Sequence, residues 1–425
     1  MEQTFKWKNW RTSLLLFLAV FGPGIITANV DNDAGGIYTY SLAGAKYGYA
    51  LLWTMIPTTI ALIVVQEMCA RMGAVTGKGL SDLIREEYGL RTTFVMMFLL
   101  ILCNFGNVVA EFAGVATSLE LFHVSKYISV PVVAVFVWLL VVKGNYKSVE
   151  KIFLVASLFY ITYIIAGVMA HPDWKLTMVR LVTTPPRSDF TDSKVIEDYV
   201  YMVIGVVGTT IAPWMQFYLQ SSIVEKGITP KQYGASRLDV IIGSIFTDVV
   251  AVFIIVACAA TLFLNGNRDI QTAADAALAL RPLAGEWAFL LFALGLLNAS
   301  VFAASILPLS TAYTVCEGLG LESGVDKKFS EAPIFYWLYT ALIAAGALLV
   351  LIPNFPFIKV IILSQVLNGI LLPFVLVFML LLINKPYLMG EYVNTKFYNF
   401  IAWLTVIIMI VLTLVLVYSY FKSDG

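Results

Sequence analysis

The sequence predicts an all-α polytopic membrane protein of eleven transmembrane helices, arranged as an inverted 5+5 repeat plus one extra helix. Three observations support this fold class. Of the 425 residues, 60% are hydrophobic and only 13% are charged, whereas soluble domains average about 45–50% apolar and about 25% charged residues. Eleven segments approach the ~20 apolar residues that span a bilayer. Two of these segments, five apart in order, contain helix-breaking residues.

The composition also excludes several classes of protein and site. The chain carries 27 basic and 27 acidic residues, so no basic surface for nucleic acid is expected. Its four cysteines lie in apolar runs without a CxxC motif, which is typical of buried small hydrophobes and not of disulfides or zinc ligands. The longest polar segment, 171–196, holds no nucleophile–base pair and no Gly-rich phosphate loop. We therefore expect neither an enzyme nor a bound cofactor.

The eleven spans are defined by runs of apolar residues. They are expected at 12–45, 48–70, 93–122, 127–142, 149–170, 197–225, 237–264, 287–317, 333–352, 357–383 and 399–421. The first is not expected to be a cleaved signal peptide, because it is long and runs into Asp31 and Asp33. The whole chain, 1–425, is then one transmembrane domain, with repeats at 12–170 and 197–383 and the extra helix at 399–421.

The distribution of basic residues predicts the orientation. With the N-terminus inside, 17 of the 27 Lys and Arg residues fall on the inner side, as the positive-inside rule requires. An odd number of spans then places the C-terminus outside. We expect a multi-pass protein of the plasma (inner) membrane, and a monomer.

The first span is interrupted by polar and small residues at membrane depth. A Gly-Pro-Gly signal at 22–24 is followed by a polar stretch at 29–36, which contains Asp31, Asn32 and Asp33. Carboxylates are costly at this depth, and paired glycines are poor residues for a helix interior. We expect the helix to unwind here, with the freed backbone groups facing a watery cavity.

The sixth span repeats this pattern. Small residues at 205–210 precede Ala212 and Pro213, and Gln216 and Gln220 follow. Pro213 removes a backbone donor and clashes with the preceding turn. For this span alone, a kink in an ordinary packed helix is an equally good interpretation. Broken helices at matching positions in two halves are instead typical of a transporter with inverted repeats, whose freed carbonyls can coordinate a cation.

These residues resemble the Nramp family of divalent-metal transporters, which implies a LeuT-type fold of eleven or twelve helices. Gly22-Pro23 lies eleven residues before Asp33, as in the family's first broken helix. The order and spacing of several further stretches carry the resemblance, and no single one would suffice. These stretches are 44–53, 110–114, 363–366, 372–374 and 388–394.

The departures from the family pattern concern its metal and proton residues. The metal-binding aspartate is kept as Asp33, but the family's asparagine position is Gly36 and its methionine position is Ala212. Gln216 is matched to the family's second asparagine and Gln220 to a nearby histidine, with one residue of register left open. In the third helix the resemblance keeps the acid Glu111, but the acidic position three residues earlier is Val108.

The loss of the methionine predicts a change of substrate. Thioether sulfur favours transition ions and is a poor ligand for magnesium. An oxygen-only site suits Mg²⁺, which usually keeps several of its waters. Ala212 and Gly36 would leave room for those waters. This agrees with the Nramp-related magnesium transporter branch, which the substitutions resemble, although Mn²⁺ also accepts oxygen ligands and remains a candidate.

We assign the expected ligands as follows. Asp33 supplies a carboxylate, Gln216 and Gln365 supply amide oxygens, and backbone carbonyls are free near Thr209 and Thr210. Candidates for the outer coordination shell are Asp31, Asn32 and Asn368. Asp31 could equally cap a half-helix, and a packing amide is the better interpretation of Asn368. Asp248, in the seventh span, is either a functional acid or part of an interhelical hydrogen bond.

The predicted function is import of Mg²⁺ and Mn²⁺ by alternating access, with a bundle of spans 1, 2, 6 and 7 rocking around a midplane site. The ion is expected to move partly hydrated, because Gly36 and Ala212 leave room for its waters. Val108 and Gln220 cannot exchange a proton, which predicts transport without obligatory proton coupling. Three alternatives remain. They are a proton-coupled Mn²⁺ or Fe²⁺ transporter, a sodium-coupled amino-acid transporter, and a membrane receptor or assembly protein without transport.

Overall fold

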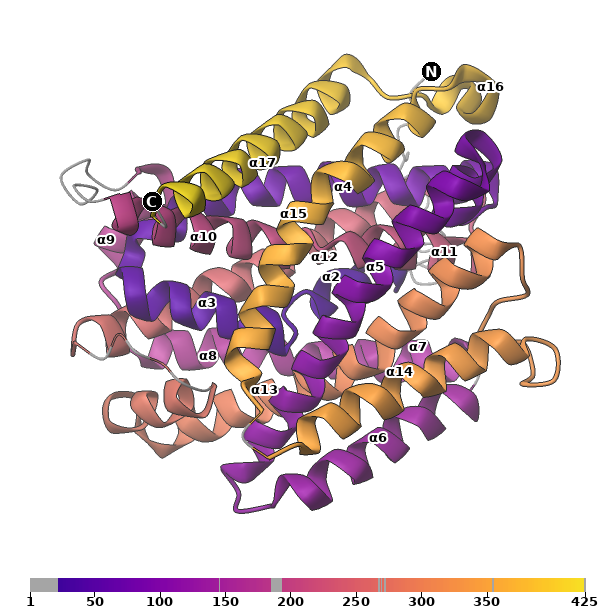
Figure 1. Ribbon diagram of the computed structural model, residues 1–425. Coiled ribbons are helices and arrows are strands. Elements are labelled where there is room, and N and C mark those ends of the chain that lie inside the picture. Colours follow the sequence, from indigo (N-terminus) through magenta and orange to yellow (C-terminus); the bar gives the residue numbers. More distant parts are fainter. Residues whose placement is uncertain are drawn as a thin grey trace, which may run out of the picture.

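The computed structural model describes residues 22–144, 146–184, 193–266, 268, 270, 273–353 and 355–423, and these ranges contain helices and no strands. Figure 1 shows the helices packed into one bundle. In chain order they are α2 (Pro23–Val30), α3 (Ala34–Tyr47), α4 (Met55–Thr76), α5 (Leu80–Glu120), α6 (Lys126–Val142), α7 (Tyr146–Ser157), α8 (Ile161–Met169), α9 (Trp174–Val182), α10 (Ser193–Thr210), α11 (Pro213–Glu225), α12 (Tyr233–Cys258), α13 (Ala273–Leu319), α14 (Pro333–Leu351), α15 (Phe357–Ile383), α16 (Pro386–Met389) and α17 (Lys396–Ser423).

The helices coincide with the predicted spans. In the described part of the chain, nine helical stretches are long and apolar enough to cross a membrane, and α6 is a shorter apolar helix. One of the nine, Ala34–Thr76, contains both α3 and α4, which are separated by a 3₁₀ stretch at Gly48–Thr54. Residues 12–21 of the first predicted span lie outside the described residues. The chain is therefore an all-helical multi-pass membrane protein.

Gly48 makes the turn between α3 and α4 possible. Its φ of 59° is in the left-handed region that favours glycine, and a Cβ there would lie 2.9 Å from the ring of Phe263. That ring belongs to a π-helical turn, Ala259–Phe263, that follows α12. The turn is thus fixed both by backbone conformation and by close packing.

Two helices differ from the predicted bounds. α13 begins at Ala273, ahead of the span predicted at 287–317, because the Ala-rich stretch before it favours helix without extending the apolar run. α5 begins at Leu80 and bends at Gly89, where φ is 80°. The residues before Gly89 form a short helix that precedes the predicted span at 93–122.

Both predicted helix breaks are present. α2 ends at Val30 and α3 begins at Ala34, so residues 31–33 form a turn between two half-helices. α10 ends at Thr210 and α11 begins at Pro213. Proline is favoured at this first helical position, where the missing N–H would have no partner within the helix. The break is thus placed by the local chemistry of Pro213.

The half-helices lie in the interior, and α17 lies on the outside. α2 packs so closely on α12 that a Cβ on Gly24 would stand 2.7 Å from the backbone nitrogen of Val240. α10 approaches α15 in the same way at Gly208. In α17, by contrast, only 17% of the most apolar stretch is buried, and Figure 1 shows this helix crossing the outer surface of the bundle. This agrees with a peripheral last helix.

Candidate metal site at the helix breaks

Asp33 forms the N-cap of α3 at the first break. Its Oδ1 accepts a hydrogen bond of 2.6 Å from the backbone nitrogen of Gly36, which satisfies one of the free donors of the first turn. Asp33 is buried, with a relative exposure of 3%. The break therefore holds a carboxylate at a fixed position in the interior, at the positive end of a helix dipole.

Asn32 anchors this break to α12. Its amide nitrogen donates to the carbonyl oxygen of Thr247 at 2.9 Å and to the Thr247 hydroxyl at 2.6 Å. The side chain is fully buried. Asn32, a candidate for the outer coordination shell, thus uses its nitrogen as a tether and has only its amide oxygen to offer an ion.

The second break presents Gln216 on the first turn of α11. Ala212 is the N-cap of α11, with an extended backbone at φ −66° and ψ 136°. When the Gln216 side-chain amide is oriented so that both its nitrogen and its oxygen can form hydrogen bonds, its nitrogen donates to the carbonyl oxygens of Ala212 and Pro213, each at 2.7 Å. The amide oxygen of Gln216 is then the atom that remains for an ion.

Three oxygens from the two breaks surround Gly36. A Cβ built on Gly36 would lie 2.4 Å from the carbonyl oxygen of Asp31, 3.2 Å from Thr209 Oγ1 and 3.4 Å from Asp33 Oδ1. Any side chain here would fill the point on which these oxygens converge. The structure thus brings Thr209 of α10 to Asp33 and Gly36, three of the residues predicted for the site.

Gln365 approaches the same break from α15. Its amide nitrogen would lie 2.0 Å from a Cβ on Gly35, and Asp33 Oδ1 would lie 3.2 Å from that Cβ. The Gln365 amide nitrogen also donates to the amide oxygen of Asn107 at 3.4 Å. The Gln365 amide oxygen accepts from the amide nitrogen of Asn368 at 3.2 Å. Asn368 is thus part of a buried amide cluster beside the site, which agrees with its interpretation as a packing amide.

Asn107 was missed by the sequence reasoning. It is fully buried on α5 and exchanges hydrogen bonds of 3.2–3.3 Å with Asn368. The available signal was its spacing, because Asn107 and Glu111 are four residues apart and share a helix face. The amide cluster fixes the position of Gln365, whose direction could not be read from the sequence.

Glu111 lies directly against Asp33. Its Oε2 accepts a hydrogen bond of 3.1 Å from the backbone nitrogen of Ala34, so both carboxylates bind the first turn of α3. Glu111 is fully buried, and its side chain interacts electrostatically with that of Asp33. The two acids form a buried pair that a cation or a proton would stabilise.

The other two altered positions face elsewhere. Val108 packs against α14, where a Cβ on Gly346 would lie 2.7 Å from its Cγ1. Gln220 donates from its amide nitrogen to the carbonyl oxygen of Lys78 at 2.8 Å. Both residues are fully buried, Val108 against α14 and Gln220 against the connection between α4 and α5.

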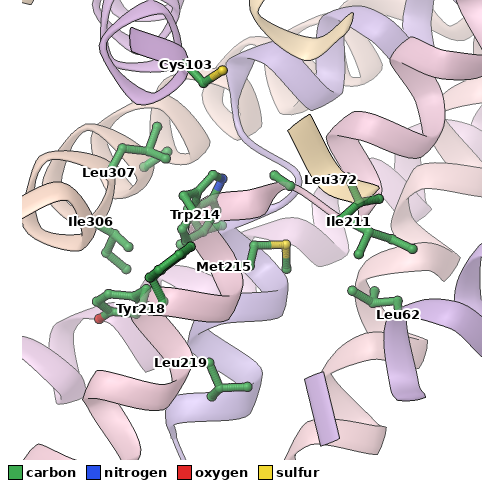
Figure 2. Close-up of a cluster of buried hydrophobic side chains, with 14 of the residues drawn as sticks. Leu62, Cys103, Ile211, Trp214, Met215, Tyr218, Leu219, Ile306, Leu307 and Leu372 are labelled. Atoms are coloured by element: carbon green, nitrogen blue, oxygen red, sulfur yellow. The ribbon is translucent and has the colours of Figure 1, made fainter. Parts of the chain in front are cut away.

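Met215 is the methionine closest in sequence to the second break. Figure 2 shows it in a cluster of buried hydrophobic side chains with Leu62, Ile211 and Leu372. Met215 itself is fully buried. Its thioether is therefore packed as a core group, which leaves carboxylate, amide, hydroxyl and carbonyl oxygens as the donors identified around Gly36.

No group of three His, Cys, Asp or Glu side chains converges as a metal cluster among the described residues. The arrangement is instead one acid pair surrounded by neutral oxygens. Such a set offers hard ligands to a divalent cation that keeps part of its hydration shell. It can bind a cation at the meeting point of two half-helices, which is where transporters of this architecture hold their ions.

Comparison with known families gives a match over nearly the whole chain. The sequence profile described as "Natural resistance-associated macrophage protein-like" (Nramp) matches residues 24–419. The chain is 26% identical over 401 residues to the divalent metal cation transporter MntH of two strains of Klebsiella pneumoniae, and covers 92% of both chains in each case.

Comparison with solved structures gives the same architecture. The manganese transporter of Eremococcus coleocola, in complex with an aromatic bis-isothiourea substituted compound, superposes with a TM-score of 0.78 at 21% identity, covering 97% of this chain and 88% of that one. MhsT in complex with L-phenylalanine superposes with a TM-score of 0.61 at 14% identity, covering 92% and 98% of the two chains. The fold is thus shared with proteins of very different sequence.

Proposed function

The chain belongs to the Nramp family, and from that premise we propose that it imports Mg²⁺, and also Mn²⁺, by alternating access at the two helix breaks. Transport of divalent metal cations is the activity of this family, and the chain is not an enzyme. The choice of magnesium, which would place the chain in the Nramp-related magnesium transporter branch, is our inference. It rests on the chemistry of the ligands.

The observation that carries this proposal is the set of oxygens around Gly36. The Asp31 carbonyl, the Thr209 hydroxyl and the Asp33 carboxylate converge there, and the Met215 thioether lies in an apolar cluster (Figure 2). Hard oxygen ligands match magnesium, whereas a soft sulfur ligand would select transition metals. The absence of a thioether at Ala212 therefore favours a site open to both Mg²⁺ and Mn²⁺.

In this site Asp33 is the charged ligand and Gln216 contributes its amide oxygen. Gln365 contributes an oxygen only if its amide turns over, because its nitrogen faces Gly35 and its oxygen accepts a hydrogen bond from Asn368. The amide nitrogen of Gln216 is bound to its own helix turn, which directs the oxygen elsewhere. The ion keeps several waters, since Mg²⁺ dehydrates reluctantly and few protein oxygens surround the point at Gly36.

Transport without obligatory proton coupling is the second part of the proposal. Val108 and Gln220 cannot titrate; Val108 packs against Gly346 and the Gln220 amide binds the carbonyl oxygen of Lys78. A divalent cation moving inward gains about 4.6 kcal/mol per 100 mV, twice the value for a single charge. The membrane potential is therefore a sufficient driving force. Metal-dependent acidification of a liposome lumen at matched voltage would contradict this part.

The basic residues support a cytoplasmic N-terminus and an external C-terminus in the plasma (inner) membrane. The contacts of Arg71 agree with this. At the end of α4, it donates to the carbonyl oxygens of Tyr392 and Val393 just before α17. α17 therefore starts at the face where α4 ends, and one crossing takes it to the other face.

We expect that proteoliposomes with a magnesium-sensitive dye will show saturable Mg²⁺ entry that Mn²⁺ inhibits. Asp33→Ala should abolish it, because the only charged ligand assigned to the ion is removed. A matched control is Asp198→Ala, which removes an exposed carboxylate paired with Lys46 at 3.0 Å and should leave entry unchanged. Magnesium entry through Asp33→Ala at the parent rate, with equal protein in the membrane, would refute the assignment.

One alternative is favoured by a specific observation. The buried pair of Glu111 and Asp33 leaves one acid beside the site that could hold a proton, as a proton-coupled Mn²⁺ or Fe²⁺ transporter needs. The names of the relatives, a manganese transporter and MntH, agree with that alternative. Manganese entry without any magnesium entry in the dye assay would decide in its favour.

A further inference from the structure

A second pair of buried acids lies beside the first break, and neither acid is accounted for by the site at Gly36. Asp31 has a relative exposure of 2% and Asp248 of 3%. All four of their carboxylate oxygens are inaccessible to solvent and lack a hydrogen-bond partner among the described residues. Buried polar groups are almost always bonded, so four unpartnered oxygens in two neighbouring side chains require an explanation.

The tether between the first break and α12 brings these two acids together. Asn32 binds Thr247 through both the backbone oxygen and the hydroxyl, and Asp31 and Asp248 are the immediate chain neighbours of these residues. The Asp248 carboxylate acts electrostatically on that of Asp31. The amide oxygen of fully buried Asn32, held between the two, is also without a partner.

Among the described residues, no positively charged group acts on Asp31 or Asp248. The charged groups that act on Asp31 are Asp248 and Asp33, both of them acids. Thr59 lies beside Asp248, but its hydroxyl donates to the carbonyl oxygen of Met55 at 2.7 Å. An uncompensated buried carboxylate is strongly destabilising, so two of them side by side indicate that a positive ligand belongs between them.

We propose that Asp31 and Asp248 form a second binding position for a divalent cation, between the end of α2 and the middle of α12. The proposal rests on the function proposed above, since it supplies a second site for the same class of ion. Asp31 and Asp248 together carry two negative charges, and the Asn32 amide adds a neutral oxygen. This set matches one divalent cation that keeps part of its water shell.

The site at Gly36 and the second position each have their own pair of carboxylates. Asp33 with Glu111 and Asp31 with Asp248 are each a pair of carboxylates, and each pair balances one divalent cation. Because residues 31 and 33 flank Asn32 in one turn, an ion at either position lies close to the other. The second position can therefore receive an ion that enters or leaves the site at Gly36.

The test is the number of Mn²⁺ ions bound by the full-length protein in detergent near neutral pH. Free Mn²⁺ is measured by its electron paramagnetic resonance signal during a titration. We expect two ions per chain for the parent and one for Asp33→Ala. Asp33→Ala combined with Asp248→Asn should bind none, and so should Asp33→Ala combined with Asp31→Asn.

A matched control replaces another buried acid of the same helix. Asp239 accepts hydrogen bonds from the backbone nitrogens of Gly22 and Gly24, so its charge is already satisfied. Asp33→Ala combined with Asp239→Asn should keep one ion. Gel filtration checks that each variant is folded. Because Asp248→Asn and Asp31→Asn should each remove the second ion, the test still holds if one of the two variants misfolds.

Two results would overturn the proposal. Asp33→Ala could bind no Mn²⁺, which would mean that only the first position exists. Alternatively, the ion bound by Asp33→Ala could remain when Asp248 and Asp31 are changed. Neither result depends on transport, so failure of the second position is distinguishable from failure of the magnesium import proposal, which the flux measurement decides.

Discussion

At the scale of single residues, Gly36 decides how closely the two breaks can meet. A Cβ at this position would stand 2.4 Å from the backbone oxygen of Asp31, a distance that real Cβ contacts do not reach, and that backbone cannot move away as a flexible side chain could. The small side chain predicted to make room for water is thus also needed for the approach of Thr209. The three oxygens can therefore come together at this point only because residue 36 is a glycine.

Gly36→Ala is therefore expected to displace the oxygens of Asp31 and Asp33. Misplacement of a ligand by about 1 Å can cost about 10²-fold in rate, so Mg²⁺ and Mn²⁺ uptake should fall by about that factor. Gly205→Ala on α10 is the matched control, because its Cβ would meet only methyl groups at 3.6 and 3.7 Å. Equal uptake by the two alanine variants in proteoliposomes would show that Gly36 is not part of the site.

Ala212 is the residue at which sulfur can be restored. It is 2% exposed at the start of α11, where the resemblance places the family's methionine. Ala212→Met should reduce Mg²⁺ uptake relative to Mn²⁺ uptake by about tenfold, which corresponds to ~1.4 kcal/mol. The physical reason is that a soft thioether replaces the water of a hard ion.

The control for that substitution is Ala212→Leu, which adds similar bulk without sulfur. It should reduce the uptake of both ions by the same factor, because only space has been lost. Competition between Mg²⁺ and Mn²⁺ in the dye assay measures the ratio directly. The oxygen-ligand explanation fails if leucine and methionine shift this ratio equally.

At the scale of elements, three helices are tied together near the start of α5. Ser221 of α11 donates to Glu317 Oε1 of α13 at 2.5 Å, Arg85 of α5 donates to the Glu317 carbonyl oxygen at 2.9 Å, and Gln220 binds the Lys78 carbonyl. We call these three contacts the α5–α11–α13 latch. With the proposed orientation, these contacts lie at the cytoplasmic end of the bundle, and we expect them to hold that end closed.

Opening the latch should expose Cys316, which is fully buried next to Glu317. Replacing both Gln220 and Ser221 by alanine removes two of the three contacts, so maleimide labelling of Cys316, followed by mass spectrometry, should accelerate severalfold. Ser305→Ala is the control, because that hydroxyl bonds only within α13, to the carbonyl of Val301. A labelling rate equal to that of the control would show that the latch does not hold this end closed.

At the scale of the whole molecule, the spans and their polarity agree with each other. The fold is shared with a manganese transporter at a TM-score of 0.78, and α17 is an outer helix that begins beside Arg71 at the end of α4. Arg71 also forms a salt bridge of 3.1 Å with Glu67, four residues earlier on the same helix face. The basic residues at this face are those that the positive-inside rule keeps in the cytoplasm.

The orientation predicts where a reporter fused after the last helix will lie. We expect an alkaline phosphatase fused to the C-terminus to be active in a bacterial inner membrane and a fused green fluorescent protein to be dark, because the predicted eleven spans and cytoplasmic N-terminus would place this end outside. The same reporters after α15, before the last crossing, should give the reverse result. Fluorescence from the full-length fusion would contradict the orientation.

The sequence by itself determined the class of the protein, the positions of its spans and the two breaks. These features are local, because hydropathy and the helix-breaking chemistry of Gly, Asp and Pro213 act within one or two turns. The acid Asp33 was found for the same reason. A carboxylate inside an apolar run is costly wherever the run packs, so it is visible without knowledge of the fold.

Only the tertiary structure decided which of these groups meet. It brought Thr209 to Gly36, joined Gln365 to Asn107, placed Gln220 at Lys78 and set Asp248 beside Asp31. The residues in these contacts come from different helices, and the tether from Asn32 to Thr247 spans 215 positions. Helix packing depends on how whole surfaces interlock, and the order of apolar and polar residues along one helix does not contain that information.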